Sequence, residues 1–270
     1  MPLAAAGALL TEAAARHRVV AAFPVLTLDH AQAVVEGAEA VRSPVIVQFG
    51  PDAVRHHAGR LLPLARAVAE LAELATVPVA LHLDRVRSTA LLAQVAHGRF
   101  SSVLYDAGLL PWARNVATTR EVVRWAHEQG LWAEGEWAGP ADPETVRAYA
   151  YATGVDALVV TDPVLLTTAL DIPLVLRASH RPPVPAGVAK LVLGPDLDAA
   201  LTRALHDRLV RDAHADPRVY LADGRRAMAA TVARSLTALD AQLPPPPSKE
   251  HLCQLLDEEA SARPSPRPSA

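Results

Sequence analysis

Eight short runs of apolar, often β-branched residues alternate along the chain with longer stretches that carry a helical period. Such alternation is typical of a parallel sheet, because parallel neighbours are joined by crossover connections that usually contain a helix. Eight strands are the number that closes a TIM barrel, a (β/α)8 fold. The sequence therefore predicts this α/β fold, with strands at 19–25, 44–50, 78–84, 101–107, 131–136, 155–162, 173–179 and 190–196.

Several helix ends are marked by residues that favour them. Asp142 followed by Pro143 has the form of an N-cap with proline at the first helical position. Gly130 and Gly154 each precede a predicted strand, as glycines that end helices commonly do. These signals place one helix before Gly130 and another between Asp142 and Gly154.

The last three predicted strands stand unusually close together. They begin at 155, 173 and 190, whereas a full βαβ unit takes about 30 residues. Residues 180–189 also contain three prolines, which a regular helix does not accommodate. We therefore expect shortened sixth and seventh βα units, followed by two amphipathic helices at 197–213 and 225–243.

The length of 270 residues suits one barrel domain, which we place at 1–243. A run of prolines then opens residues 244–270, which we predict to be a mostly disordered tail with one short helix. At the other end of the chain, an amphipathic helix is predicted to begin near Thr11. A signal peptide is not expected there, because no basic region precedes the apolar residues.

Composition narrows the classes of partner. The formal net charge is −3, and the arginines are scattered among acidic residues, so no basic surface for nucleic acid is predicted. No apolar run approaches the roughly 18 residues needed to cross a membrane. The one cysteine excludes an internal disulfide. We therefore expect a cytoplasmic protein that binds neither nucleic acid nor membrane.

The segment 78–85, PVALHLDR, has the form of a buried strand that carries polar groups at its carboxyl end. It resembles the third barrel strand of the class II, zinc-dependent fructose-bisphosphate and tagatose-bisphosphate aldolases. Two longer segments, at 21–50 and 101–139, are similar to the first two strands of that family and to its fourth and fifth strands with the helix between them. The resemblance covers roughly residues 15–240, and it implies a TIM barrel, a C–C bond lyase and a homo-oligomer.

The same resemblance implies a zinc ion held by histidines from three loops, but this chain departs from that pattern. Arg85 stands at the first ligand position and Arg177 at the third, and residues 159–176, which match the second, contain no histidine. A guanidinium has no lone pair for a metal and stays protonated. We therefore expect no zinc site and no other cofactor.

Lysine chemistry is also constrained, because the chain contains only Lys190 and Lys249. A Schiff base needs a lysine that is aimed into the mouth of the barrel. Lys249 lies in the predicted tail. Lys190 begins the last predicted strand, which would place it at the floor of the barrel, away from a substrate.

Two arginines and several acids are predicted to meet at the carboxyl ends of the strands, where active sites of such barrels lie. Arg85 and Arg177 have the chemistry to hold a carboxylate or phosphate bidentately and to stabilise a developing enolate. The alternative is structural: each arginine fills the volume of a lost ligand and neutralises a leftover carboxylate.

Three carboxylates are the predicted catalytic residues. Asp84 matches the proton-transferring aspartate of the family. Glu134 and Glu136 are two apart on one strand, so they share a face and supply a second base or an orienting group.

Asp106 and His180 complete the predicted substrate-binding set with Arg85 and Arg177. For Asp106 the alternative is a cap of the loop before the fourth helix, and for His180 it is an exposed loop position.

These features predict a divergent member of the family, which acts as a metal-independent lyase or isomerase on a small anionic carbonyl or sugar-like substrate. Two alternatives stay open. One is a catalytically inactive barrel that binds a ligand or a partner subunit, and the other is an aldolase with an unanticipated metal arrangement.

Overall fold

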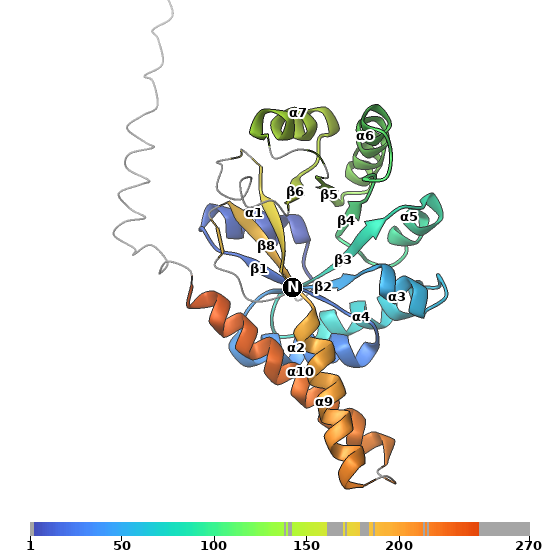
Figure 1. Ribbon diagram of the computed structural model, residues 1–270, viewed down its shortest axis with the longest axis vertical. Helices are drawn as coiled ribbons and strands as arrows, with labels where there is room; N and C mark the ends of the chain where they lie inside the picture. Colours follow the sequence, from blue (N-terminus) through green and yellow to red (C-terminus); the bar gives the residue numbers. More distant parts are fainter. Residues whose placement is uncertain are drawn as a thin grey trace, which may run out of the picture.

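Eight parallel strands close into a barrel in the computed structural model, which describes residues 3–137, 139, 142–160, 170, 172–178, 184–185, 187–212, 214 and 216–242. The strands follow the order of the chain, and the last pairs with the first (Figure 1). The predicted TIM barrel is therefore confirmed. The strands are β1 Val20–Pro24, β2 Val45–Phe49, β3 Val79–Val86, β4 Ser102–Tyr105, β5 Trp132–Glu136, β6 Ala157–Val160, β7 Leu174–Ala178 and β8 Val188–Leu193.

Helices cover the outside of the barrel and follow most of the strands in the chain (Figure 1). The last two form a pair that projects away from the barrel, and α10 also packs along α2. The helices are α1 Ala6–Ala15, α2 Leu28–Val41, α3 Pro51–His56, α4 Leu62–Leu74, α5 Thr89–Val95, α6 Trp112–Glu128, α7 Pro143–Thr153, α9 Pro195–Arg211 and α10 Pro217–Asp240.

The predicted helix signals around α7 are confirmed by its geometry. The Asp142 carboxylate accepts a hydrogen bond of 2.9 Å from the Thr145 backbone N–H, and Pro143 is the first helical residue. Gly154 ends the helix in the left-handed region, with φ 72°. Strand β6 ends at Val160, β7 begins at Leu174 and β8 begins at Val188. Most of the residues between these strands lie outside the described ranges, so the shortened sixth and seventh units stay a prediction.

The N-terminal helix begins earlier than predicted, at Ala6 rather than near Thr11. Its first residues bind to the amino ends of the strands: the Ala4 N–H donates to the Val79 carbonyl and the Ala6 N–H to the Ser101 hydroxyl. Leu10 is fully buried and packs with side chains from inside the barrel. The helix therefore closes the floor of the barrel, which leaves the carboxyl ends of the strands as the open end.

The second helix of the C-terminal pair also begins earlier than predicted, at Pro217 rather than near 225. Asp216 caps it by accepting a hydrogen bond of 2.8 Å from the Arg218 N–H. This aspartate–proline pair is the same N-terminal signal as in α7, and it was overlooked. The predicted tail at 244–270 lies outside the described residues. No helix that the structure describes is long and apolar enough to cross a membrane.

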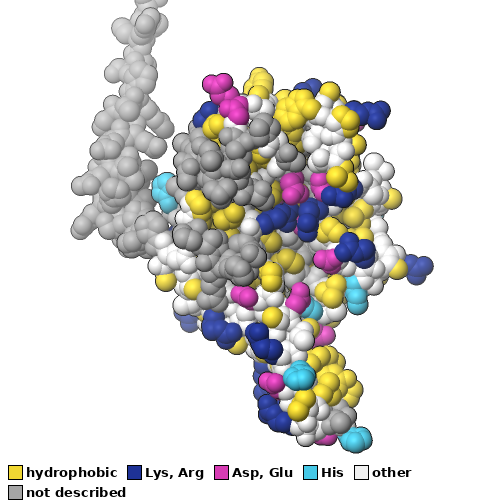
Figure 2. Space-filling model, in the orientation of Figure 1, with side chains coloured by type: hydrophobic (Ala, Val, Ile, Leu, Met, Phe, Trp, Pro, Cys, Tyr) yellow, Lys and Arg dark blue, Asp and Glu magenta, His cyan; other side chains and the backbone are white. Residues whose placement is uncertain are grey.

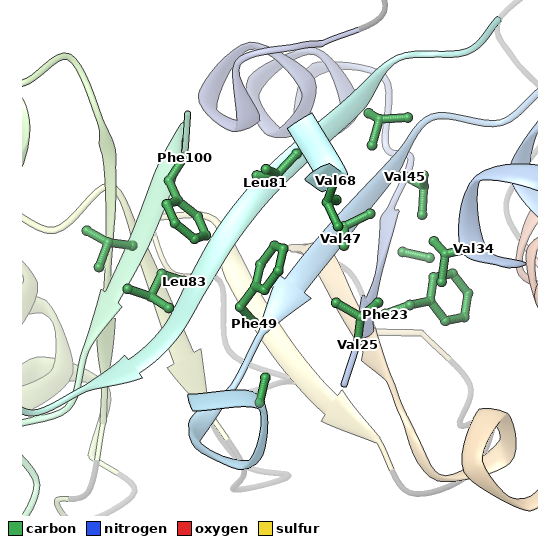
Figure 3. Close-up of a cluster of buried hydrophobic side chains, with 14 of the residues drawn as sticks. Phe23, Val25, Val34, Val45, Val47, Phe49, Val68, Leu81, Leu83 and Phe100 are labelled. Carbon is green, nitrogen blue, oxygen red and sulfur yellow. The ribbon is translucent and has the colours of Figure 1, made fainter. Parts of the chain in front are cut away.

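The larger part of the core lies between the strands and the surrounding helices. Figure 3 shows side chains of β1, β2 and β3 packed with residues of α2 and α4. Phe49 and Phe100 meet edge to face there, with ring centroids 5.3 Å apart. Burial of each such side chain stabilises the fold by about 1.5–3 kcal/mol. This layer holds the strands in register, so the residues at their carboxyl ends are placed on a rigid frame.

Candidate active site

A cavity of about 810 Å³ opens at the carboxyl ends of the strands. Basic and acidic side chains lie side by side near the middle of the face shown in Figure 2. This is the end of the barrel where enzymes of this fold place their active sites. The described residues that line the cavity are Pro24, Val25, Leu26, Gln48, Gly50, Asp52, Ala53, Asp84, Arg85, Arg177, Val192, Gly194, Pro195 and Asp198.

The centre of the site is a bidentate ion pair between Asp84 of β3 and Arg177 of β7. The two terminal nitrogens of Arg177 donate to the two Asp84 oxygens at 2.7 and 3.0 Å. Asp84 is almost fully buried, whereas the Arg177 side chain keeps 20% of its surface exposed. Parallel, charge-assisted bonds of this kind are strong and fix the relative orientation of the two groups. The predicted meeting of residues from the third and seventh strands therefore occurs.

Arg85 lies at a break in the register of β3. Leu83 pairs with Val103 and Val86 with Tyr105, so β3 carries one extra residue in a β-bulge. Arg85 occupies the left-handed region there, with φ 51°, which is uncommon for a residue other than glycine. Its side chain is 42% exposed, and its Nε donates to Asp84 at 3.2 Å. The bulge thus places a guanidinium at the edge of the cavity rather than deep inside it.

A second ion pair lies inside the barrel, beneath the cavity. The Lys190 ammonium contacts both oxygens of Glu134 at 2.7 Å, and both side chains are only 1% exposed. Burial raises the pKa of Glu134 and lowers the pKa of Lys190, and the charge of each partner opposes the shift. Glu134 is therefore sealed inside the barrel, whereas Glu136 on the same strand is partly exposed.

His82 lies between the two ion pairs. Its Nδ1 is 2.8 Å from the Ser102 hydroxyl, and its Nε2 is 3.7 Å from Glu134 and 4.0 Å from Asp84. Burial, reinforced by the charges of Lys190 and Arg177, lowers the pKa of His82 well below its usual value. The imidazole is therefore neutral, and it separates the cavity from the interior pair without adding charge.

The position of Lys190 corrects a prediction, because its side chain points into the barrel rather than lying at the floor. Leu174 pairs with Val188 and Val175 with Lys190, so Ala189 is an extra residue in β8. This bulge turns Lys190 toward Glu134, beside interior residues such as Val175. Lys190 is still sealed from the cavity, so it is not placed to form a Schiff base.

Glu136 is the carboxylate with the fewest partners at the mouth. Its side chain is 25% exposed, and its Oε2 lies 4.0 Å from Arg177 with no hydrogen-bond partner among the described residues. Burial raises the pKa of Glu136, and the positive charge of Arg177 opposes that shift. A partly exposed carboxyl group with a raised pKa is a candidate for proton transfer.

Asp106 lies at the side of the mouth and is held by its own arginine. Arg87 donates to its Oδ2 at 2.7 Å from Nε and 2.5 Å from a terminal nitrogen, and the Gly108 N–H donates at 2.9 Å. The bond from Gly108 agrees with the alternative of a loop cap. The structure thus brings Asp84, Arg85, Arg177 and Glu136 together, and places Glu134 beneath them. His180 lies outside the described residues.

Sequence reasoning missed Arg87 and the interior position of Lys190. Arg87 had a signal, since it follows Arg85 at a spacing of two after the same strand. Lys190 also carried a signal, because it stands at the start of an apolar strand. A lysine that is buried in such a strand needs an acidic partner, since an unpaired buried charge is costly.

The described residues of the mouth do not fit a zinc ion. Both oxygens of Asp84 are taken by Arg177, and a second guanidinium, Arg85, contacts the same carboxylate. Zinc in proteins is bound by imidazole, thiolate or carboxylate groups, usually four in number. Among the described residues, no group of three or more such side chains is placed to hold a metal ion. No step of the chemistry below therefore passes through zinc.

Comparison with known proteins places the chain among aldolases. The family model described as class II fructose-bisphosphate aldolase matches residues 4–163. The fructose-bisphosphate aldolase of Staphylococcus aureus is 28% identical over 272 residues, which cover 86% of this chain and 95% of the relative. That of Geobacillus stearothermophilus is also 28% identical, over 273 residues with the same coverage.

Solved structures of aldolases have the same fold. The YdjI aldolase of Escherichia coli K12 superposes with a TM-score of 0.77 at 23% identity, over 88% of this chain and 97% of that structure. The fructose-bisphosphate aldolase of Campylobacter jejuni gives a TM-score of 0.74 at 21% identity, over 86% and 93%.

Proposed function

We propose that this chain, which belongs to the class II fructose-bisphosphate aldolase family, is a lyase or isomerase that acts without zinc on a small anionic carbonyl or sugar-like substrate. The observation that carries the proposal is the pair of Arg177 with Asp84, which sets a guanidinium in a cavity at the carboxyl ends of the strands. A homo-oligomer and a cytoplasmic location belong to the same proposal.

Arg177 and Arg85 supply the positive charge of the proposed site. Cleavage of a C–C bond next to a carbonyl leaves an electron pair that becomes the enolate oxygen. Preorganised donors aimed at that oxygen lower the barrier, and they act most strongly in a site that excludes water. Asp84 holds Arg177 in place from below, so that its fork is oriented before the substrate arrives.

Glu136 is the proposed proton-transferring group. Its carboxylate accepts the proton of a hydroxyl group β to the carbonyl, the bond between the α and β carbons breaks, and the electron pair moves to the enolate oxygen. The same carboxyl then returns the proton to the α carbon, which leaves two carbonyl products and the original carboxylate. An isomerase uses the same group to move a proton from the α carbon instead.

Asp84 is a less available base in the observed arrangement. Its two oxygens accept three guanidinium N–H bonds, two from Arg177 and one from Arg85. Arg177 must leave before Asp84 can take a proton from a substrate. We therefore propose Asp84 as the residue that positions the arginines, and Glu134 as the buried partner of Lys190.

A second candidate function is supported by one observation. Each of the mouth carboxylates Asp84 and Asp106 already has an arginine partner. Charges that satisfy one another need no substrate, so an inactive barrel that binds a ligand or a partner subunit also accounts for these contacts.

An activity screen separates the two candidates. The purified protein is treated with a metal chelator and assayed for cleavage or isomerisation of small sugar phosphates and hydroxy-keto acids. The proposed function predicts activity that survives chelation and falls by about 10²–10⁴-fold in Glu136→Gln. Activity that disappears with the chelator and returns with zinc would contradict the proposal. Ligand binding without turnover would favour the inactive barrel.

A further inference from the structure

The cavity at the mouth of the barrel has an apolar side as well as a charged one. The charged groups of the candidate site that line it, Asp84, Arg85 and Arg177, come from β3 and β7. Strands β8 and β1 pair with each other and lie between β7 and β2 around the barrel. At the ends of β8 and β1 the lining residues are Pro24, Val25, Leu26, Val192, Gly194 and Pro195. None of these six has a polar side chain, and together they form the apolar sector of the cavity.

The register of the two strands explains why this sector faces inward. Ala22 of β1 pairs with Val192 of β8, and both belong to the cluster of side chains inside the barrel. Pro24 lies two residues beyond Ala22, so it shares that inward face. Gly194 lies two residues beyond Val192, and a Cβ atom on Gly194 would be only 3.3 Å from the Pro24 Cγ. The glycine therefore leaves room for a ligand beside the proline ring.

Leu26 extends the apolar sector toward the rim. Its side chain is half-buried in the free protein, so a ligand that covers it removes further apolar surface from water. The Leu26 carbonyl accepts a hydrogen bond of 2.9 Å from the ring Nε2 of His57. This bond ties the loop after β1 to the end of α3 through its backbone, and it does not depend on the Leu26 side chain.

Two carboxylates at the rim of the cavity already have partners. Asp198 Oδ1 lies 3.3 Å from Nε2 of the buried His30, and Asp52 pairs with Arg55 on the exposed surface of α3. Neither His30 nor Arg55 lines the cavity. A negatively charged ligand group in the apolar sector would have no cation beside it, and burial of an unpaired charge is costly. An uncharged, apolar group has no such cost there.

From this arrangement we propose that the substrate carries an apolar alkyl or aryl substituent that packs against Pro24, Leu26 and Val192. Its carboxylate and carbonyl groups then lie at Arg85 and Arg177. This inference rests on the proposed function for the carbonyl chemistry, but the apolar subsite itself stands on the cavity lining alone. A volume of about 810 Å³ is within the range of pockets that enclose ligands larger than three carbons. The substrate class is therefore a hydroxy-keto acid with an apolar side group, rather than a polyhydroxylated sugar.

The experiment compares two 2-keto acids, pyruvate and 4-methyl-2-oxopentanoate, which share the carboxylate and carbonyl and differ by a branched alkyl group. Binding to the full-length protein is measured by calorimetry at several temperatures. Leu26→Asn replaces an apolar side chain by a polar one of similar size and keeps the backbone bond to His57. Leu109→Asn is the matched control, because Leu109 is an exposed leucine that does not line the cavity.

We expect the unchanged protein to bind the branched acid about 10-fold or more tightly than pyruvate, because each buried CH₂ group adds a factor of about four in affinity. The heat-capacity change on binding should also be more negative for the branched acid, since more apolar surface is buried. Leu26→Asn should lose most of this preference, and Leu109→Asn should keep it. Equal affinity for the two acids in the unchanged protein, no binding of either acid, or an undiminished preference in Leu26→Asn would overturn the proposal.

Failure of this inference and failure of the proposed function give different results. Glu136→Gln removes the proposed proton transfer but leaves the apolar sector unchanged, so it should keep the preference for the branched acid. That preference without turnover of any hydroxy-keto acid would remove the lyase or isomerase and keep the apolar subsite. Turnover that is equally fast with and without an apolar substituent would remove the apolar subsite and keep the catalyst.

Discussion

The barrel contains two carboxylate–cation pairs whose chemistry is nearly the same and whose surroundings differ. Glu134 and Lys190 are sealed inside the barrel, whereas Asp84 and Arg177 form part of the wall of a cavity. A sealed pair has no ligand to meet, so it can only satisfy buried charge and hold strands β5 and β8 together. The pair at the cavity leaves part of its guanidinium in reach of a ligand. Access, rather than the identity of the residues, separates a structural pair from a candidate site.

The largest effect is expected where the interior pair is broken on one side. Lys190→Met leaves the Glu134 carboxylate buried without its partner, and the free energy of unfolding should fall by about 3–5 kcal/mol. Urea denaturation measures this change. The double variant Glu134→Leu/Lys190→Met removes both charges and should recover most of the loss. If Lys190→Met alone is as stable as the unchanged protein, the interior pair is not structural.

A smaller loss of stability is expected at the cavity. Arg177→Met leaves Asp84 its hydrogen bond from Arg85 at the wall of the cavity, so the free energy of unfolding should fall by about 1–3 kcal/mol. The same variant should lose the proposed activity, because the donor nearest the enolate is gone. The comparison of the two pairs fails if Arg177→Met destabilises the protein more than Lys190→Met in the same denaturation series.

The smallest expected effect is a dependence of the free energy of unfolding on pH. Burial raises the pKa of Glu136 above its usual value near 4.5, so the folded protein binds this proton more tightly than the unfolded chain does. The protonated Glu136 carboxyl group therefore adds to the free energy of unfolding at pH values below its ordinary pKa. This contribution is lost as the pH rises through the raised pKa of the folded protein. Glu136→Gln cannot ionise, so its stability relative to the unchanged protein should increase as the pH rises above about 4.5.

Denaturation of both proteins at several pH values measures this difference. Glu70→Gln is the matched control, since Glu70 is an exposed side chain on α4. A difference that is flat or decreases with pH for Glu136→Gln would show that burial does not act on this carboxyl group.

The fold could be predicted from the sequence, because short apolar segments typical of strands alternate clearly with longer segments that carry a helical period. The caps of α7 could be assigned from Asp142, Pro143 and Gly154, whose conformational preferences act locally. The same signal at Asp216 and Pro217 was missed, so the start of α10 was predicted near 225 instead of at Pro217. Elements defined by local chemistry were thus predicted better than their exact ends.

The candidate site could be predicted from the sequence only in part. Glu134 and Glu136 are two residues apart on one strand, which predicted that they share a face. The sequence did not predict that a step of about 6.6 Å along the strand would separate a sealed carboxylate from a partly exposed one. The inward turn of Lys190 and the outward position of Arg85 depend on two β-bulges. A bulge is set by packing between neighbouring strands, and no residue at either position signals it in the sequence.

Hydrogen exchange at the α carbon of a three-carbon hydroxyketone phosphate, followed by NMR in D2O with chelator-treated protein, identifies the carboxylate that transfers the proton. We predict exchange in the unchanged protein and in Glu134→Leu/Lys190→Met, and a large loss in Glu136→Gln. Exchange that needs added zinc, or that survives in Glu136→Gln while the interior double variant abolishes it, would contradict the assignment of the working carboxylate to the mouth of the barrel.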